Sequence, residues 1–183
     1  MANTSPEFKF ARDVIRYVLT EYWPGTHWNP SGMFIEYDLD SPCTPAVQEL
    51  MKNILDDGGV DLHAFYDECF PDKNITVLQH YEFCQYIKYR MIMVDEPEDA
   101  KEAFLVLCGS LSLFTALSVV YGVNDAPFVT HREILRYFKS LQYLDLITDT
   151  FWMELQTFCE LTCKKRNITV SKCLILDSIQ FKY

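Results

Sequence analysis

The side chains best suited to chemistry in this sequence are its histidines and cysteines. The four histidines show no zinc-ligand spacing with the seven cysteines, and no two cysteines form a Cys-x-x-Cys pair. Cys159 and Cys163 would share one helix face and could hold half of a metal site, but no second half is evident. Small, buried, inert thiols are the favoured interpretation. The sequence therefore predicts no metal site and no cofactor.

Other catalytic patterns are missing from the sequence as well. It contains no glycine-rich phosphate loop and no nucleophile elbow. The paired carboxylates Asp56-Asp57 and Glu98-Asp99 fall at predicted helix ends, where capping explains them. We therefore expect a protein that is not an enzyme and that binds partners, for example in an apolar groove between amphipathic helices.

Composition and charge narrow the class of partner. The 183 residues are 49% hydrophobic and 23% charged, as expected of one globular domain over residues 1–183. The formal net charge of −10 disfavours nucleic acids and anionic membranes as main partners, because phosphate binding needs clustered Lys and Arg. The number of cysteines is odd, and the N-terminus shows no signal segment. Together these features predict reduced thiols in the cytosol.

The first part of the chain is predicted to form one helix and a loop. Ser5-Pro6-Glu7 is typical of a helix start, with a hydroxyl cap, a proline at the first helical position and an acid in the first turn. Pro24-Gly25 is expected to end this helix. A loop follows over residues 24–43, with an extended piece around Phe34-Ile35.

Further helices are predicted along the rest of the chain. Thr44-Pro45 starts one helix, which Gly58-Gly59 is expected to break or kink before a short helical turn. Apolar residues recur at helical spacing over residues 76–94. Thr130-His131-Arg132-Glu133 is a capping box and predicts the next helix start. The last helix is expected near Thr148-Asp149.

The segment from residue 103 to residue 120 carries no formal charge and is closed by Gly122 as the expected cap. Its length is at the threshold for a membrane span, but its small and hydroxyl-bearing residues and the absence of flanking basic clusters favour the buried core helix of a bundle. Both interpretations stay open. With an irregular tail at residues 167–183, the sequence predicts an all-α fold of about seven helices around a buried central hydrophobic helix.

Four segments carry a resemblance to a known family. Residues 14–19, followed by Gly25 and Trp28, resemble a first helix with a tryptophan-containing exit. An amphipathic motif helix with an acid is matched in spacing by Val47, Met51, Ile54 and Asp56. The other two matches are Ala100-Lys101 with Gly109-Ser110, and the segment 149–155 with Trp152.

On these residues the chain resembles a divergent, virus-like member of the B-cell lymphoma-2 (Bcl-2) family of apoptosis regulators, over roughly residues 8–166. The two middle segments stand where the family has its third and first homology motifs, and the last stands where it has the second. The Asn-Trp-Gly-Arg signature of the first motif is reduced here to Ala100-Lys101. Lysine keeps the charge of the arginine but not its bidentate fork.

The resemblance implies a Bcl-2-like bundle that binds the amphipathic death-motif (Bcl-homology-3) helices of pro-apoptotic Bcl-2 proteins in a hydrophobic groove and blocks cell death. Lys101 would contact the acid of the incoming helix. The groove would be formed by Leu62, Phe65, Tyr66, Ile87, Met91, Asp99, Ala100, Lys101 and Phe104. For each apolar member of this set, an ordinary core position is an equally good interpretation.

Two other functions stay open at this point. Some virus-encoded relatives with degraded motifs use the surface of the bundle to inhibit NF-kappa-B or other innate signalling, which the reduced signature favours. A small integral membrane protein that spans with residues 103–120 is the more distant alternative. The resemblance implies a cytoplasmic protein, with peripheral placement at mitochondria and a homodimer left open.

Overall fold

The structure is a computed structural model, and it describes residues 5–93 and 99–165. Within these residues the chain is all-α, as predicted, with six α-helices where about seven were expected. The expected irregular tail at residues 167–183 lies outside the described residues. The helices are α1 Pro6–Tyr17, α2 Pro45–Cys69, α3 Val77–Met93, α4 Ala100–Val120, α5 Ala126–Tyr143 and α6 Phe151–Lys165.

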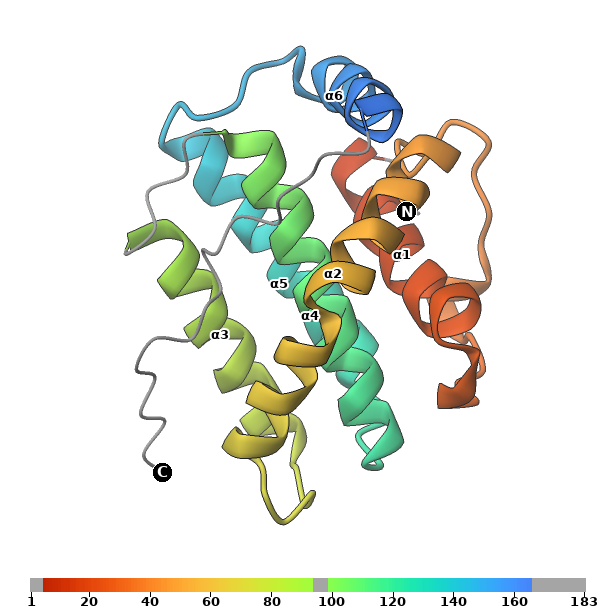
Figure 1. Ribbon diagram of the computed structural model, residues 1–183, viewed down its shortest axis with the longest axis vertical. Helices are drawn as coiled ribbons and strands as arrows, with labels where there is room; N and C mark the ends of the chain where they lie inside the picture. Colours follow the sequence, from red (N-terminus) through yellow and green to blue (C-terminus); the bar gives the residue numbers. More distant parts are fainter. Residues whose placement is uncertain (1–4, 94–98, 166–183) are drawn as a thin grey trace.

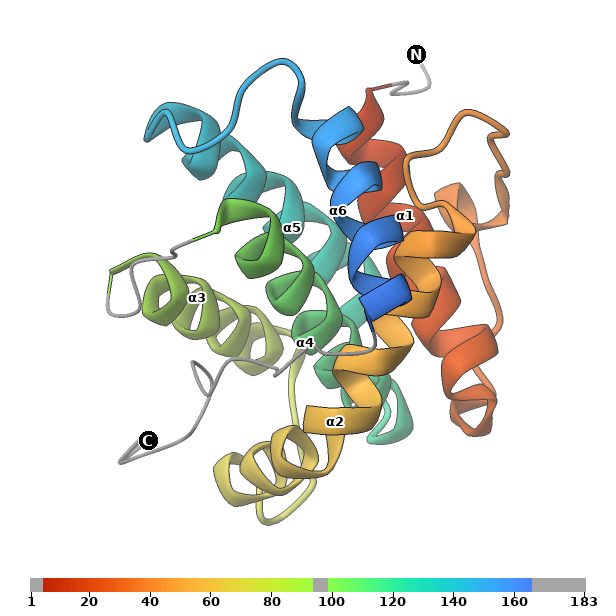
Figure 2. The same cartoon turned by 45° about the horizontal axis from the view of Figure 1, so that its top comes forward.

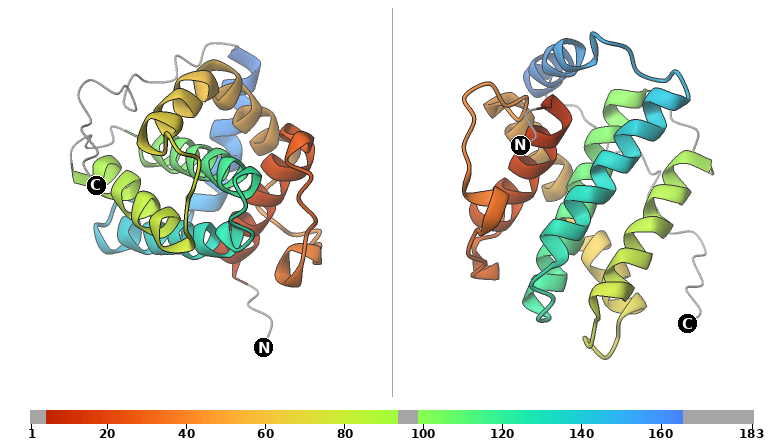
Figure 3. Two further views of the ribbon diagram at one scale, coloured as in Figure 1. Left: turned by 90° about the horizontal axis from the view of Figure 1, so that it is seen from below. Right: turned by 180° about the vertical axis from the view of Figure 1, so that it is seen from behind.

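Helix α4 lies at the centre of the bundle (Figure 1). The other five α-helices all pack against it. A view from one end shows α1, α2, α3 and α5 arranged around α4 (Figure 3, left). A tilted view shows α6 next to α1 and α2 (Figure 2), and α6 also packs against α2. This arrangement confirms the predicted buried central helix.

The uncharged segment is central because it has no polar face to turn toward water. The Asp99 carboxylate caps the first turn of α4 by accepting the backbone N–H of Lys101 at 2.8 Å. Gly122 follows the helix with a φ of 93°, a left-handed conformation that glycine adopts without strain, as predicted for the cap. By length and composition α4 could cross a membrane, but 89% of its apolar window is buried by the other helices.

The expected break at Gly58-Gly59 is wrong, because α2 continues through both glycines to Cys69. Each glycine costs about 1 kcal/mol relative to alanine inside a helix. On either side of the pair, however, Leu55 and Leu62 are buried in the core. Burying one such side chain contributes about 1.5–3 kcal/mol. Packing against α4 therefore outweighs the local preference to end the helix.

The capping box at Thr130 is also wrong as a helix start. Helix α5 begins one turn earlier, at Ala126, with a proline in its first turn. Thr130 and Glu133 are instead fully buried inside the helix, where their polar atoms bind side chains of α3 and α4. The motif predicted a helix correctly but not the partners of its polar residues.

The expected extended piece at Phe34-Ile35 is a 3-10 helix, Gly32–Ile35. Its turn brings the Phe34 ring into the core, edge-on to the rings of Trp28 and Phe128 at centroid distances of 5.3 and 5.2 Å. The predicted loop at residues 24–43 thus contains two 3-10 turns, Pro24–Thr26 and Gly32–Ile35. Before this loop, a π-helical turn, Val18–Tyr22, continues α1 directly.

Replacement by alanine is expected to have opposite effects on stability at two glycines inside helices. A Cβ at Gly109 would lie 2.6 Å from Met51 Sδ, at the tight crossing of α4 and α2. We expect Gly109→Ala to lower the free energy of unfolding by roughly 1–3 kcal/mol, because the buried Met51 must move. At Gly59 the nearest atoms lie at 3.7 and 3.9 Å. Gly59→Ala should raise the free energy of unfolding by roughly 0.5–1 kcal/mol.

Urea unfolding followed by circular dichroism measures both variants. A loss of stability in Gly59→Ala equal to that in Gly109→Ala would contradict the close crossing as the cause.

Candidate functional site

The apolar residues predicted to form a groove lie in the core. Leu62, Phe65 and Tyr66 on α2, and Ile87 and Met91 on α3, are each no more than 5% exposed. The α2 and α3 residues approach one another through Phe83, whose ring centroid lies 5.7 Å from that of Phe65. The Tyr66 ring stacks on Phe114 of α4 at 5.6 Å. In this structure the walls of the predicted groove are therefore packed together.

The axes of α2 and α3, which carry these residues, are not parallel (Figure 1). Helices α2 and α3 meet next to the loop that joins them and diverge toward the end of the bundle where α4 begins (Figure 1). Asp99, Ala100 and Lys101 lie at that end, and all three are half-buried. Lys101 Nζ lies 3.5 Å from Asp99 Oδ1 and 3.8 Å from Glu154 Oε2 of α6. The amine that was predicted to meet a partner's acid thus already faces two carboxylates.

Phe104 belongs to a different cluster from the other groove candidates. It is fully buried, and its ring centroid lies 5.2 Å from Phe10 of α1 and 5.6 Å from Phe138 of α5. The rings of Phe151 and Trp152 on α6 complete the cluster at 5.5 and 6.0 Å. Phe104 therefore joins α4 to α1, α5 and α6 in the packing that the structure shows.

A chain of buried polar side chains, which nothing in the sequence indicated, crosses the bundle. His80 of α3 is fully buried, with Nδ1 2.8 Å from Ser118 Oγ and Nε2 2.9 Å from Thr130 Oγ1. Tyr66 extends this chain from Ser118, and Thr115 extends it from Thr130. Burial lowers the pKa of His80 to about 4, so the ring is neutral at pH 7.

A histidine beside a serine is a pair that could activate a nucleophile. Here, however, both side chains are fully buried, so no substrate reaches Ser118 in this conformation. The hydrogen bonds join α2, α3, α4 and α5. We therefore assign this chain a structural role, in which it satisfies polar groups inside the core.

A buried ion pair also joins α3 to α5. Glu133 is fully buried and pairs with Lys88. It also accepts hydrogen bonds from Gln85 Nε2 at 2.6 Å and Arg136 Nη1 at 2.7 Å. Several donors therefore compensate for the loss of water around this carboxylate. Among the described residues, no group of three or more potential ligand side chains is placed to hold a metal ion.

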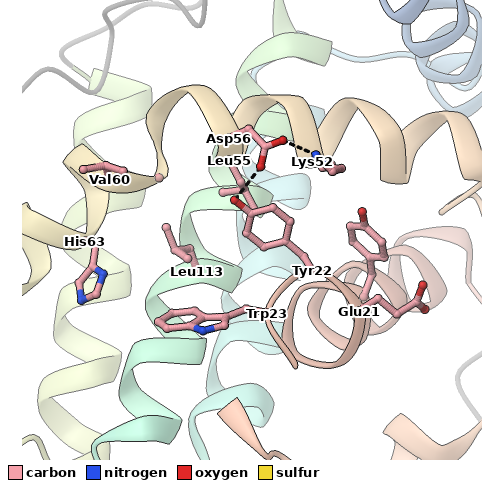
Figure 4. A pocket seen from close by; sticks show the side chains of 11 residues that line it. Glu21, Tyr22, Trp23, Lys52, Leu55, Asp56, Val60, His63 and Leu113 are labelled. Carbon is pink, nitrogen blue, oxygen red and sulfur yellow. Dashed lines mark hydrogen bonds and ion pairs between the residues drawn. The ribbon is translucent and has the colours of Figure 1, made fainter. Parts of the chain in front are cut away.

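A cavity of about 670 Å³ opens between the π-helical turn and α2 (Figure 4). Its floor is formed by Leu113 of α4 and Leu55 of α2, both buried. Figure 4 shows the Trp23 indole beneath Leu113, between Tyr22 and His63. The remaining lining side chains are Tyr17, Glu21, Lys52, Asp56 and Val60, with Gly59 on the backbone.

The polar groups of this cavity are organised around Asp56. Its Oδ1 accepts a hydrogen bond from the Tyr22 hydroxyl at 3.2 Å, and its Oδ2 pairs with Lys52 one turn earlier on α2. Burial and the neighbouring carboxylate raise the pKa of Tyr22 to about 12. Tyr22 is therefore a neutral hydrogen-bond donor at pH 7. Asp56 was predicted to belong to a motif helix, but nothing in the sequence indicated a cavity beside it.

Comparison with known proteins gives no family for this chain. No protein-family model matches it, and neither the curated proteins nor the solved structures include a significant match.

Proposed function

We propose that this protein is a regulator of apoptosis, most simply anti-apoptotic, that binds the amphipathic death-motif helices of pro-apoptotic Bcl-2 proteins. The observation that carries the proposal is the divergence of α2 and α3 over α4, toward the half-buried amine of Lys101 (Figure 1). An amphipathic helix binds in such a place with its apolar face on α4 and an acid near the cation.

The packing of the motif segments supports the proposal. Met51, in the segment that resembles the third homology motif, contacts the helix at Gly109, in the segment that resembles the first. Trp152, in the segment that resembles the second, packs on Phe104 near the start of α4. The segments that carry the resemblance thus meet around one helix.

Binding of a helix in this place requires the packed walls to separate. Phe65 and Tyr66 must move away from Phe83, which exposes apolar surface that the incoming helix then covers. The affinity is reduced by the fraction of molecules that are open, and we therefore expect slow association. The glycines inside α2 lower the local cost of such a movement.

Titration calorimetry with a panel of death-motif peptides tests the proposal. We expect at least one peptide to bind the wild-type protein at one-to-one stoichiometry. Lys101→Gln should weaken that binding by about tenfold, because it removes a charge-assisted contact with the peptide's acid. Glu154→Gln, the matched control, removes a carboxylate that competes for the same amine and should bind equally well or more tightly.

A peptide whose conserved aspartate is replaced by asparagine should no longer distinguish Lys101→Gln from the wild type. This double-mutant cycle isolates the contact of the two charges from any change in folding. No binding by any peptide, with the protein folded, would refute the proposal.

A second candidate function is favoured by the closed packing of Leu62, Phe65, Tyr66, Ile87 and Met91. A bundle whose groove stays closed can still bind partners with its outer surface, as in an inhibitor of NF-kappa-B or other innate signalling. An NF-kappa-B reporter assay in cells, run beside a cell-death assay, separates the two. Inhibition of the reporter without protection from death would favour this second function.

A further inference from the structure

We propose that the cavity between the π-helical turn and α2 binds an arginine side chain of a partner protein. Three observations support it: the aromatic walls of the cavity, its charge, and the unusual helical turn that forms one side. This site is separate from the proposed groove and does not depend on it.

The walls of the cavity suit a planar cation. Trp23, Tyr22 and Tyr17 line it, and the Trp23 and His63 ring centroids lie 6.0 Å apart. Aromatic faces attract cations, and a guanidinium also stacks on them through its own flat face. The buried floor of Leu55 and Leu113 suits the methylene stem of the same side chain.

The charge of the cavity also selects a cation. Two carboxylates, Glu21 and Asp56, line the cavity. Among the described residues that line it, Lys52 is the one formally basic side chain. Lys52 is more than half exposed, so an incoming guanidinium can take its place beside Asp56. Asp57 and Asp61, both exposed on α2, add negative charge outside the cavity. An acidic or neutral apolar ligand would not use these groups.

The turn beside the cavity has a rare backbone geometry. The backbone N–H of Trp23 donates to the Val18 carbonyl at 2.9 Å, five residues back, as in a π-helix. Such turns are rare and occur frequently at functional sites. Here the end of α1 and the turn together bring Tyr17, Glu21 and Tyr22 to the cavity.

The polar residues of the cavity and Phe65 of the proposed groove lie on different sides of α2. Asp56, Gly59 and His63 recur at helical spacing on one face, whereas Phe65 lies on the opposite face and packs toward α3. A partner can therefore occupy the cavity whether or not the groove is open. Failure of the death-motif peptides to bind would therefore not contradict the arginine site. Failure of arginine to bind would likewise not contradict the proposed groove.

The test is a titration of the full chain with a blocked arginine, N-acetyl-arginine methylamide, followed through the indole N–H signal of Trp23 by NMR. The signal is assigned by its loss in Trp23→Leu. We expect a saturable shift with a millimolar dissociation constant. N-acetyl-citrulline methylamide, the uncharged analogue of the same length, should bind at least about tenfold more weakly, because it lacks the cation.

Two variants locate the site. Glu21→Gln, at an exposed residue of the cavity, should weaken arginine binding severalfold, whereas Glu160→Gln, at an exposed carboxylate of α6, should leave it unchanged. Trp23→Leu should abolish saturable binding. Because this variant lacks the indole, its titration is followed through the backbone N–H signal of Gly59. Equal binding of citrulline and arginine, or no saturation at 100-fold excess over the protein, would overturn the proposal.

Discussion

Lowering the pH from 7 to 5 is expected to reduce the free energy of unfolding by about 4 kcal/mol, half of it through His80 and half through His131. Burial lowers the pKa of each ring to about 4, against 6.5 in the unfolded chain. As the pH falls through 6.5, the unfolded chain takes up these protons and the folded protein does not. The stability is therefore complete above pH 6.5 and is lost progressively down to about pH 4.

Such a loss is large compared with the roughly 5–15 kcal/mol by which a domain of this kind is stable. Each histidine contributes because its ring is held inside the fold as a neutral hydrogen-bonding group. His131 Nε2 donates to the Phe8 carbonyl at 3.1 Å, and His80 bonds through both of its nitrogens. Protonation would place an extra charge among buried neighbours.

Urea unfolding at pH 7, 6 and 5 measures this dependence. His131→Gln keeps a donor for the Phe8 carbonyl and should remove about half of the pH dependence, whatever its effect on stability at pH 7. His27→Asn removes an exposed loop histidine, in a left-handed conformation that asparagine tolerates, and serves as the matched control. A pH dependence unchanged in His131→Gln would contradict the assignment.

Replacing Phe104 with alanine is expected to lower the free energy of unfolding by about 3–5 kcal/mol. The ring is fully buried and contacts aromatic side chains of α1, α5 and α6, so its removal leaves a cavity where four helices meet. A residue that lines an open groove would instead be exposed, and its truncation would have little effect on stability.

Urea unfolding at pH 7 measures the effect of Phe104→Ala. Tyr143→Ala removes an aromatic ring that is 88% exposed at the end of α5, and we expect it to change stability by less than about 0.5 kcal/mol. A loss below about 1 kcal/mol in Phe104→Ala would contradict the core position of the ring, and would make the groove interpretation of this residue the better one.

Which of the helices exist, and which one is central, could be predicted from the sequence alone. These features depend on neighbours three or four residues apart and on the residues at helix ends. Ser5-Pro6 and Thr44-Pro45 mark the starts of α1 and α2, and the run without charge from residue 103 to residue 120 has no face that favours water. The resemblance to the Bcl-2 family rests on the same local patterns, and it stays a proposal.

The partners of the polar residues were decided by the tertiary structure. Thr130 and Glu133 have the spacing of a helix cap, but inside the bundle they bind His80 and Lys88 of α3. Nothing near them in the sequence indicates this, because the partners lie about 50 residues away along the chain. Once these groups lose water, only hydrogen bonds across the helices compensate for it.

The continuity of α2 and the arginine site proposed beside it also depend on the tertiary structure. Gly58-Gly59 locally favours a break, but burial of Leu55 and Leu62 in the core contributes more than the two glycines cost. The continuous helix then lies opposite the π-helical turn, and the space between them becomes the cavity. Local sequence determines helices, whereas the surfaces between helices depend on which residues meet after folding.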